Sequence, residues 1–186
     1  MRFLLFMRYS PNVNVIKQRD RINKMTPQEL RIDLKPVLPT DTEVVKLIEK
    51  LNKYQIGLYG IEMCNLESPE SLQKNNSVMM GAYVNNELAG IGAVKFFDTY
   101  AEIKRMFVEE NYRGLSISGT ILNALEEQAA QKGIYRICLE TGNLHQQALK
   151  FYNKSGYQQI ESFGNYKPNK VSVYFEKIIS AAYLKQ

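Results

Sequence analysis

Three observations predict an α/β fold with a mixed central β-sheet of about six to seven strands, flanked by about four helices. Residues 102–108 have the side-chain pattern of a half-buried strand. A helix pattern follows, because apolar side chains recur every four residues, at Ile117, Ile121, Leu125 and Ala129. Two apolar runs, 78–84 and 88–97, flank Asn85-Asn86 and predict a β-hairpin, since asparagine tolerates positive φ.

The first part of the chain predicts one strand and two helices. Residues 30–36 alternate as a strand, and the Thr-Asp-Thr-Glu run at 40–43 is a capping box for a helix. The apolar positions of that helix are Val44, Leu47, Ile48 and Leu51. A second short helix begins near Ser68, with Pro69 early in it. Residues 1–28 are mostly polar and irregular, so we expect an N-terminal extension or arm followed by a single domain, 29–186.

The remaining elements follow from the same patterns. Alternation places Ile103, Arg105 and Phe107 on one face of the strand at 102–108, and Glu102, Lys104, Met106 and Val108 on the other. Gly133 ends the central helix as a C-terminal glycine. Downstream we expect a strand at 134–140, a helix over the region from 148, a strand at 157–161, a loop at 163–169 and a strand at 171–177.

The turn before the central helix is rich in small residues and reads Arg113-Gly114-Leu115-Ser116-Ile117-Ser118-Gly119. A strand that delivers such a turn onto a helix N-terminus exposes unpaired N–H groups at the positive end of the helix dipole. The sequence therefore predicts a phosphate-binding site. Neither the Gly-Lys-Ser/Thr ending of nucleotide hydrolases nor the three glycines of dinucleotide-binding folds is present.

Composition narrows the function classes. The chain has 186 residues, 45% of them hydrophobic, which suits one domain with a continuous core. Its net charge of +5 suits an anionic cofactor better than nucleic acid, because the 24 basic residues are scattered. We expect no signal peptide, since the N-terminal apolar run is only about five residues and no small-residue cleavage site follows it. We also expect no membrane span, since no apolar run approaches roughly 18 residues. Cys64 and Cys138 do not require a disulfide, which favours a reduced cytoplasmic setting.

The phosphate-binding turn resembles the coenzyme A pyrophosphate loop of the GNAT superfamily, the acetyl-CoA-dependent N-acyltransferases. The family pattern Arg/Gln-x-x-Gly-x-Gly/Ala is matched at Arg113, whereas Ser116 and Ser118 stand where glycine or alanine is usual. Residues 148–157 resemble the family's Ala-x-x-x-Tyr-x-x-x-Gly-Phe box. The chain also resembles a bacterial subgroup of the family in four further motifs: Glu-Ile-Lys-Arg-Met at 102–106, Leu-Glu-Thr-Gly at 139–142, Phe-Gly-x-Tyr at 163–166 and Ser-Val at 172–173.

The resemblance implies the GNAT fold and an N-acetyltransferase that uses acetyl-CoA as co-substrate, without a metal. The acetyl group would pass directly to a primary amine on a small molecule, peptide or protein. Such aminolysis requires removal of a proton from the amine and protonation of the leaving thiolate. A homodimer is common in the superfamily and is expected here on that ground alone. A non-catalytic acyl-CoA-binding or interaction protein is the alternative, and a nucleic-acid binder is the third.

The resemblance also suggests catalytic residues. Tyr152 falls on the family's tyrosine beside the coenzyme A sulfur and would protonate the thiolate, although it could instead be only a buried aromatic. Glu102 is the first candidate for the base, and Glu140 is a rival at the end of the next strand. Glu102 could equally be paired or solvated.

The resemblance also implies which residues contact the cofactor, by their positions in the family motifs. Phe107 and Val108 match the strand end that pairs with the pantetheine arm, and the pyrophosphate turn comprises Arg113, Gly114, Leu115, Ser116, Ile117 and Ser118. His145 lies where many relatives place a cofactor-contacting asparagine, so a cofactor-side or helix-capping role is favoured over catalysis. Asn143 could supply the missing amide. The segments 54–66 and 163–169 would lie near the acceptor, or serve only as packing.

Overall fold

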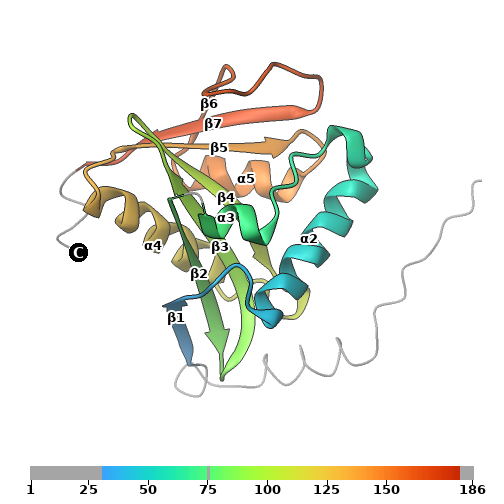
Figure 1. Ribbon diagram of the computed structural model, residues 1–186, viewed down its shortest axis with the longest axis vertical. Helices are drawn as coiled ribbons and strands as arrows, with labels where there is room; N and C mark the ends of the chain where they lie inside the picture. Colours follow the sequence, from blue (N-terminus) through green and yellow to red (C-terminus); the bar gives the residue numbers. More distant parts are fainter. Residues whose placement is uncertain (1–30, 75, 181–186) are drawn as a thin grey trace, which may run out of the picture.

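The structure is a computed structural model that describes residues 31–74 and 76–180 (Figure 1). The predicted arm at 1–28 therefore lies outside the described residues. The elements, in chain order, are β1 (Ile32–Pro36), α2 (Thr42–Tyr59), η1 (Ile61–Met63), α3 (Pro69–Lys74), β2 (Ser77–Val84), β3 (Glu87–Phe96), β4 (Ala101–Val108), η2 (Glu110–Tyr112), α4 (Ile117–Gln131), β5 (Arg136–Gly142), α5 (Gln146–Lys154), β6 (Gln158–Ile160) and β7 (Ser172–Ile178).

Seven strands form one mixed sheet in the order β1-β2-β3-β4-β5-β7-β6. Strands β1 to β4 are antiparallel neighbours, β4 and β5 are parallel, and β7 lies antiparallel between β5 and β6. Together with the α-helices α2 to α5, this confirms the predicted mixed sheet flanked by helices. The order also puts β4 and β5 at the centre of the sheet.

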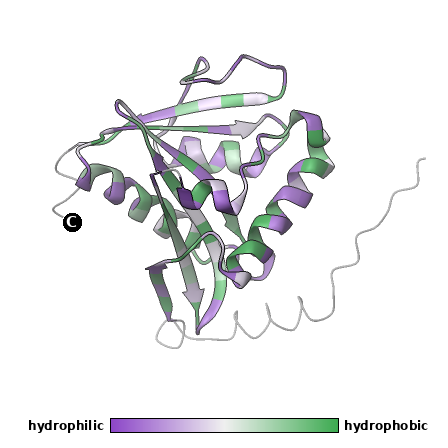
Figure 2. Cartoon of the chain, in the orientation of Figure 1, coloured by the Kyte–Doolittle hydropathy of each residue, from purple (hydrophilic) through white to green (hydrophobic). Residues whose placement is uncertain are grey.

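Helices cover both faces of the sheet. The buried residues of α4, which include Ile117, Ile121, Leu125 and Ala129, join the largest core cluster together with Tyr152 of α5. On the other face, Val44, Leu47 and Ile48 of α2 and Leu72 of α3 form a second cluster with β2 and β3. Figure 1 shows α2 and α4 on opposite sides of the sheet, and Figure 2 shows hydrophobic and hydrophilic residues alternating along both helices. The predicted apolar positions of these helices are thus confirmed.

The hairpin and the end of the central helix are as predicted. Asn85 and Asn86 connect β2 to β3 with φ of 49° and 68°, the left-handed conformation that a two-residue turn requires. Gly133 follows α4 with φ of 74°, and its N–H donates to the Ala130 carbonyl.

The predicted capping box is wrong. Helix α2 has Asp41 at its N-cap and no side-chain cap, because the Asp41 carboxylate accepts the N–H of Leu38 at 3.0 Å instead. Glu43 accepts a hydrogen bond from the Tyr83 hydroxyl, so it cannot turn back to the helix start. Helix α2 also extends to Tyr59, so the front part of the expected connector at 54–66 is helical.

Strand β4 does not alternate throughout as predicted, because it contains a β-bulge. Ile91 pairs with Phe107 and Ala93 with Lys104, so Gly92 alone faces both Arg105 and Met106. Arg105 has φ of 57°. An inserted residue reverses the faces of the side chains that follow it. Met106 therefore packs with the α4 cluster and Phe107 with the α2 cluster, opposite to the predicted faces.

No helix within 31–74 and 76–180 is long and apolar enough to cross a membrane. In the same residues, no group of three or more histidine, cysteine, aspartate or glutamate side chains could hold a metal ion. Cys64 and Cys138 are both free thiols.

Gly92 lets α4 approach the sheet closely, which gives a test of this packing. A Cβ at Gly92 would lie 2.5 Å from Met106 Sδ and 2.6 Å from Ile121 Cγ2. We expect Gly92→Ala to lower the free energy of unfolding by about 1–3 kcal/mol through overpacking. Gly57→Ala is the matched control: nothing lies within 4 Å of the added Cβ in α2, so stability should rise by about 0.5–1 kcal/mol. Urea unfolding measures both changes, and equal stability of the two variants would contradict the packing described.

Candidate active site

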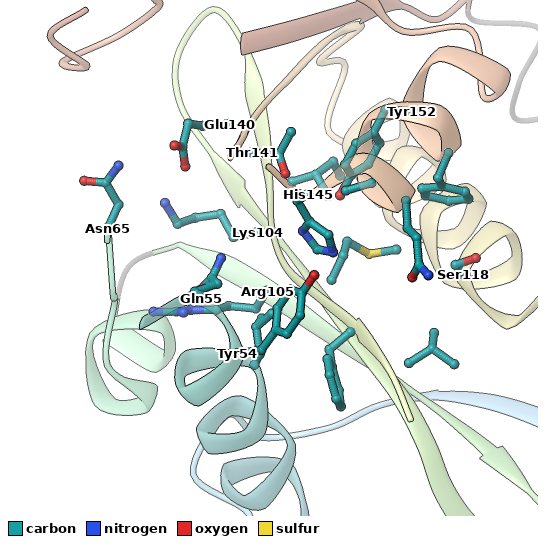
Figure 3. Close-up of a pocket in the computed structure, with 18 of the residues that line it drawn as sticks. Tyr54, Gln55, Asn65, Lys104, Arg105, Ser118, Glu140, Thr141, His145 and Tyr152 are labelled. Carbon is teal, nitrogen blue, oxygen red and sulfur yellow. The ribbon is translucent and has the colours of Figure 1, made fainter. Parts of the chain in front are cut away.

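The site is a cleft that opens where β4 and β5 separate. The two strands pair only from Ala101 with Ile137 to Ile103 with Leu139, although both continue beyond these residues. A cavity of about 230 Å³ lies at this divergence and is lined by β4, β5, α2, α5 and the start of α4 (Figure 3). Backbone groups of both strands that leave the ladder there need other partners.

The cavity has two chemically distinct halves. Figure 3 shows Ser118 and Tyr152 on one side and Gln55, Asn65 and Glu140 on the other. Arg113 and Ala148 also line the first side, which faces the turn predicted to bind phosphate. The second side is polar and charged. We call these the turn side and the polar side.

The turn side is built on left-handed backbone. Gly114 has φ of 93°, and Ser116, at the N-cap of α4, has φ of 60°. Ser118 lies within the first turn of α4, where a serine Cβ causes no backbone conflict. The Arg113 Nε donates to the Val108 carbonyl at 3.2 Å and ties the turn to the end of β4. The first-turn N–H groups of α4, which lack helical partners, are thus presented beside a cationic side chain.

Tyr152 is both a core aromatic and a cavity residue. Its side chain is 7% exposed and its ring lies 5.7 Å from the Tyr157 ring, yet it lines the cavity. Burial raises the pKa of Tyr152, so the phenol stays protonated at neutral pH. No side chain or backbone group of the described residues hydrogen-bonds its hydroxyl. That hydroxyl is therefore available to donate to a bound group.

Glu102 is buried and paired. It is 4% exposed and accepts hydrogen bonds from the Tyr166 hydroxyl at 2.5 Å and from Lys104 Nζ at 3.1 Å. Burial, followed by the charge of Glu102, raises the pKa of Tyr166, which keeps this phenol a donor. Of the two alternatives to a catalytic Glu102, the structure shows pairing with protein groups. Both hydrogen bonds are accepted by Oε1 of the carboxylate.

Lys104 links Glu102 to a second carboxylate. Its Nζ lies 3.7 Å from Glu67 Oε2, and Glu67 also pairs with Lys95 at 2.8 Å. Burial alone would raise the pKa of Glu67, but the Lys95 hydrogen bond and the charge of Lys104 outweigh it, and the pKa is lowered. Opposite charges therefore alternate from Glu102 at the cavity through Lys104 and Glu67 to Lys95.

Glu140 faces the cavity from β5. Its Oε1 accepts a hydrogen bond from the Ser172 hydroxyl at 2.5 Å, and no cation of the described chain pairs with it. In Figure 3 its carboxylate points toward the Lys104 side chain. Glu140 can therefore accept further hydrogen bonds from a ligand. Glu102 has less of this capacity left, because two protein groups already donate to it.

His145 lies at the N-cap of α5 but its side chain does not cap the helix. Its ring is 5.1 Å from that of Tyr54 and lines the cavity. Burial, and then the charge of Arg113, lowers the pKa of His145, so the imidazole is neutral at pH 7. Asn143 does not line the cavity, and its Nδ2 donates to the Lys170 carbonyl at 3.0 Å.

The predicted cofactor residues are thus only partly brought together. Phe107, Val108, Arg113, Ser118, His145 and Tyr152 line the cavity, as do both carboxylate candidates. Gly114, Leu115, Ser116 and Ile117 shape the turn but do not line the cavity. Gln55 and Asn65, from the segment 54–66 that the sequence placed near the acceptor, also line it. Side chains for which the sequence suggested no role line it as well: Lys104, Arg105, Thr141, Gln147 and Phe151. Lys104 and Arg105 belong to the Glu-Ile-Lys-Arg-Met motif, but strict alternation would place their side chains on opposite faces of β4. In the bulged strand, both residues line the cavity.

Gly142 allows α2 to reach across the end of β5. The Tyr59 hydroxyl accepts the N–H of Leu144 at 2.8 Å, and a Cβ at Gly142 would lie 2.1 Å from Tyr59 Oη. The tyrosine therefore lies directly on the glycine. This contact fixes the end of α2, which carries Tyr54 and Gln55 of the cavity wall.

The fold and the cleft define an acyltransferase of the GNAT class, and comparison with known proteins agrees. Residues 44–157 match the acetyltransferase (GNAT) family. The chain is 34% identical over 142 residues to an IAA acetyltransferase of Azospirillum brasilense, covering 75% of this chain and 92% of that protein. It is 32% identical over 141 residues to the uncharacterized N-acetyltransferase YsnE of Bacillus subtilis, covering 74% and 93%.

Solved structures show the same fold. A Klebsiella pneumoniae protein assigned as an acyl-CoA N-acyltransferase superposes with a TM-score of 0.67 at 27% identity, covering 79% of this chain and 97% of that one. The PaiA N-acetyltransferase of Thermoplasma acidophilum, solved with coenzyme A, gives a TM-score of 0.64 at 20% identity, covering 80% and 99%. The chain belongs to the GNAT family and is an N-acetyltransferase that uses acetyl-CoA.

The turn side fits the anionic part of that co-substrate. The N-terminus of α4 offers unpaired N–H groups, and Arg113 adds a positive charge beside them. Ser118 is in helical geometry, and only Ser116 is strained. The two serines that depart from the family pattern are therefore compatible with the loop.

The strain at Ser116 is measurable. A non-glycine residue at φ of 60° costs on the order of 1 kcal/mol, so we expect Ser116→Gly to raise the free energy of unfolding by about that amount. The control Ser118→Gly removes a side chain from the helix itself and should lower stability by about 0.5 kcal/mol. Thermal unfolding of both variants checks the signs, and the same sign at both positions would refute the assigned backbone geometry.

Proposed function

We propose that the chain transfers the acetyl group of acetyl-CoA directly to a primary amine bound on the polar side of the cleft. The observation that carries this proposal is the pairing of two features in one cavity. A protonated, unengaged tyrosine lies on the turn side, and two carboxylates lie on the polar side. Acetyl-CoA supplies the activated thioester acyl group. The amine-bearing acceptor is a small molecule or a peptide or protein amino group.

Tyr152 is proposed to donate a proton to the sulfur of the leaving coenzyme A. Its raised pKa keeps the proton in place until a stronger base forms nearby, and a departing thiolate is such a base. Its position in α5, beside the cavity, is fixed by packing against Tyr157 and Phe175. A rigid donor of this kind needs no rearrangement.

Glu140 and Glu102 are the two groups that could take the proton from the amine. Glu102 already accepts hydrogen bonds from the Tyr166 hydroxyl and from Lys104 Nζ, so part of its acceptor capacity is used by protein groups. Glu140 accepts only from Ser172 and keeps more free acceptor capacity. The geometry therefore favours Glu140, directly or through water, over the first sequence candidate Glu102, which would then orient Tyr166 and Lys104.

The bulge in β4 is proposed to supply the group that faces the thioester carbonyl. Because two residues of β4 oppose Gly92 alone, one backbone N–H near Arg105 and Met106 is left out of the ladder. Both residues line the cavity. A fixed backbone donor at that point would stabilise the negative charge that develops on the carbonyl oxygen.

The proposal predicts a selective defect in Tyr152→Phe. We expect the rate of acetyl transfer, measured by release of free thiol with a panel of amines, to fall by about 10²-fold or more. The dissociation constant for acetyl-CoA should change little, because the ring and its packing remain.

Tyr135→Phe is the control, since Tyr135 is exposed and does not line the cavity. It should turn over like the unmodified protein. Full activity in Tyr152→Phe would exclude Tyr152 as the proton donor. Binding of acetyl-CoA with no transfer to any amine would instead favour a non-catalytic acyl-CoA-binding protein.

A further inference from the structure

Arg105 adopts a conformation that its residue type does not favour. It occupies the β-bulge with φ of 57°, in the left-handed region where a side chain is disfavoured. The residue is 7% exposed, so the charged group is buried and does not face solvent. Burial lowers the pKa of Arg105, which shows the cost of desolvating the guanidinium. Both the left-handed backbone and the burial of the charge are thus unfavourable for an arginine.

The buried guanidinium bonds to two separate segments. Its Nη1 donates to Asn52 Oδ1 of α2 at 2.8 Å, and its Nη2 donates to the backbone carbonyl of Glu67, between η1 and α3. None of the described carboxylates forms an ion pair with it, and its buried Nε finds no acceptor among the described residues. The guanidinium therefore joins the bulge to α2 and to the 64–68 segment through neutral acceptors.

Those two segments form one wall of the cavity. Gln55 lies one helical turn after Asn52, and Asn65 lies two residues before Glu67. Both line the polar side. Arg105 thus connects the unpaired backbone of β4 to the wall on which an acceptor would rest.

We infer that Arg105 is a positioning residue of the acetyl transfer, which holds the β4 bulge and the acceptor wall in one fixed arrangement. This inference rests on the proposed function for its catalytic consequence, but not for the clamp itself. Arg105 makes no contact with the reacting atoms in this role. It acts through the Arg105–Met106 backbone and through Gln55 and Asn65.

A purely stabilising role does not account for these observations. Glycine would adopt φ of 57° without strain, and removing the guanidinium would also remove a buried donor without a partner. Losing the two hydrogen bonds opposes these gains. We therefore expect Arg105→Gly to unfold at nearly the same temperature as the unmodified protein while its site is disordered.

The test compares Arg105→Gly and Arg105→Lys with the unmodified protein. Lysine keeps the positive charge, but its single ammonium cannot reproduce the forked geometry that reaches two acceptors on different segments. Asn86→Gly is the matched control, because Asn86 has φ of 68° at the hairpin turn and does not line this cavity. It introduces glycine at another position of positive φ, away from the cleft.

Hydrogen exchange followed by mass spectrometry reports on the clamp without any ligand. In both Arg105 variants we expect backbone exchange in 60–68 and in the last turn of α2 to rise by about tenfold or more. Exchange in β5 and α4 should be unchanged. Unchanged exchange in 60–68, or an equal rise across the chain, would overturn the clamp.

The catalytic consequence is read from the carbonyl infrared band of bound [1-¹³C]acetyl-CoA. A hydrogen bond to the carbonyl oxygen lowers the stretching frequency of the carbonyl group. The unmodified protein and Asn86→Gly should therefore shift the band of bound acetyl-CoA to lower frequency. Arg105→Gly should still bind acetyl-CoA but lose most of that shift. An unaltered shift in Arg105→Gly would refute the positioning role. No acetyl-CoA binding by the unmodified protein would refute the proposed function, while the exchange result would still decide the clamp.

Discussion

The separation of β4 from β5 is the constraint on which the site depends. Parallel strands at the centre of a sheet normally bond along their whole length, yet this pair stops after three residues. The bulge at Arg105 turns β4 away and leaves backbone groups outside any ladder. Since buried backbone groups need partners, the cleft they form is suited to a ligand that pairs like a strand. The cavity, its two sides and its chemistry all follow from this break.

Charge is distributed differently on the two sides of the cleft. The turn side combines a helix N-terminus with Arg113, which suits an anionic group. The polar side balances Lys104 and Arg105 against Glu102 and Glu140. Tyr152 lies on the turn side and keeps its proton because it is buried. An acyl donor and an amine acceptor would thus meet at the break in the sheet, each held by groups of suitable charge.

The sequence predicted the regular parts of the fold because those parts depend on local patterns. The fourfold spacing in α4, Gly133 after it and the Asn85-Asn86 turn each fix one conformation. It failed where one residue was inserted, since a bulge leaves no pattern in a strand of mixed composition, and the faces of Met106 and Phe107 were reversed. It also could not show that Glu102 accepts a hydrogen bond from Tyr166, 64 residues away. Long-range pairing of this kind appears only in three dimensions.

Every proposed step of the reaction requires that the altered turn and the cleft bind acetyl-CoA, and calorimetric titration measures this binding. Purified protein is titrated with acetyl-CoA and, separately, with adenosine diphosphate as a control for phosphate binding alone. We expect saturable one-to-one binding of acetyl-CoA that is clearly tighter than binding of adenosine diphosphate, because the cleft adds contacts beyond the turn. Absence of binding, or equal affinity for both ligands, would contradict it.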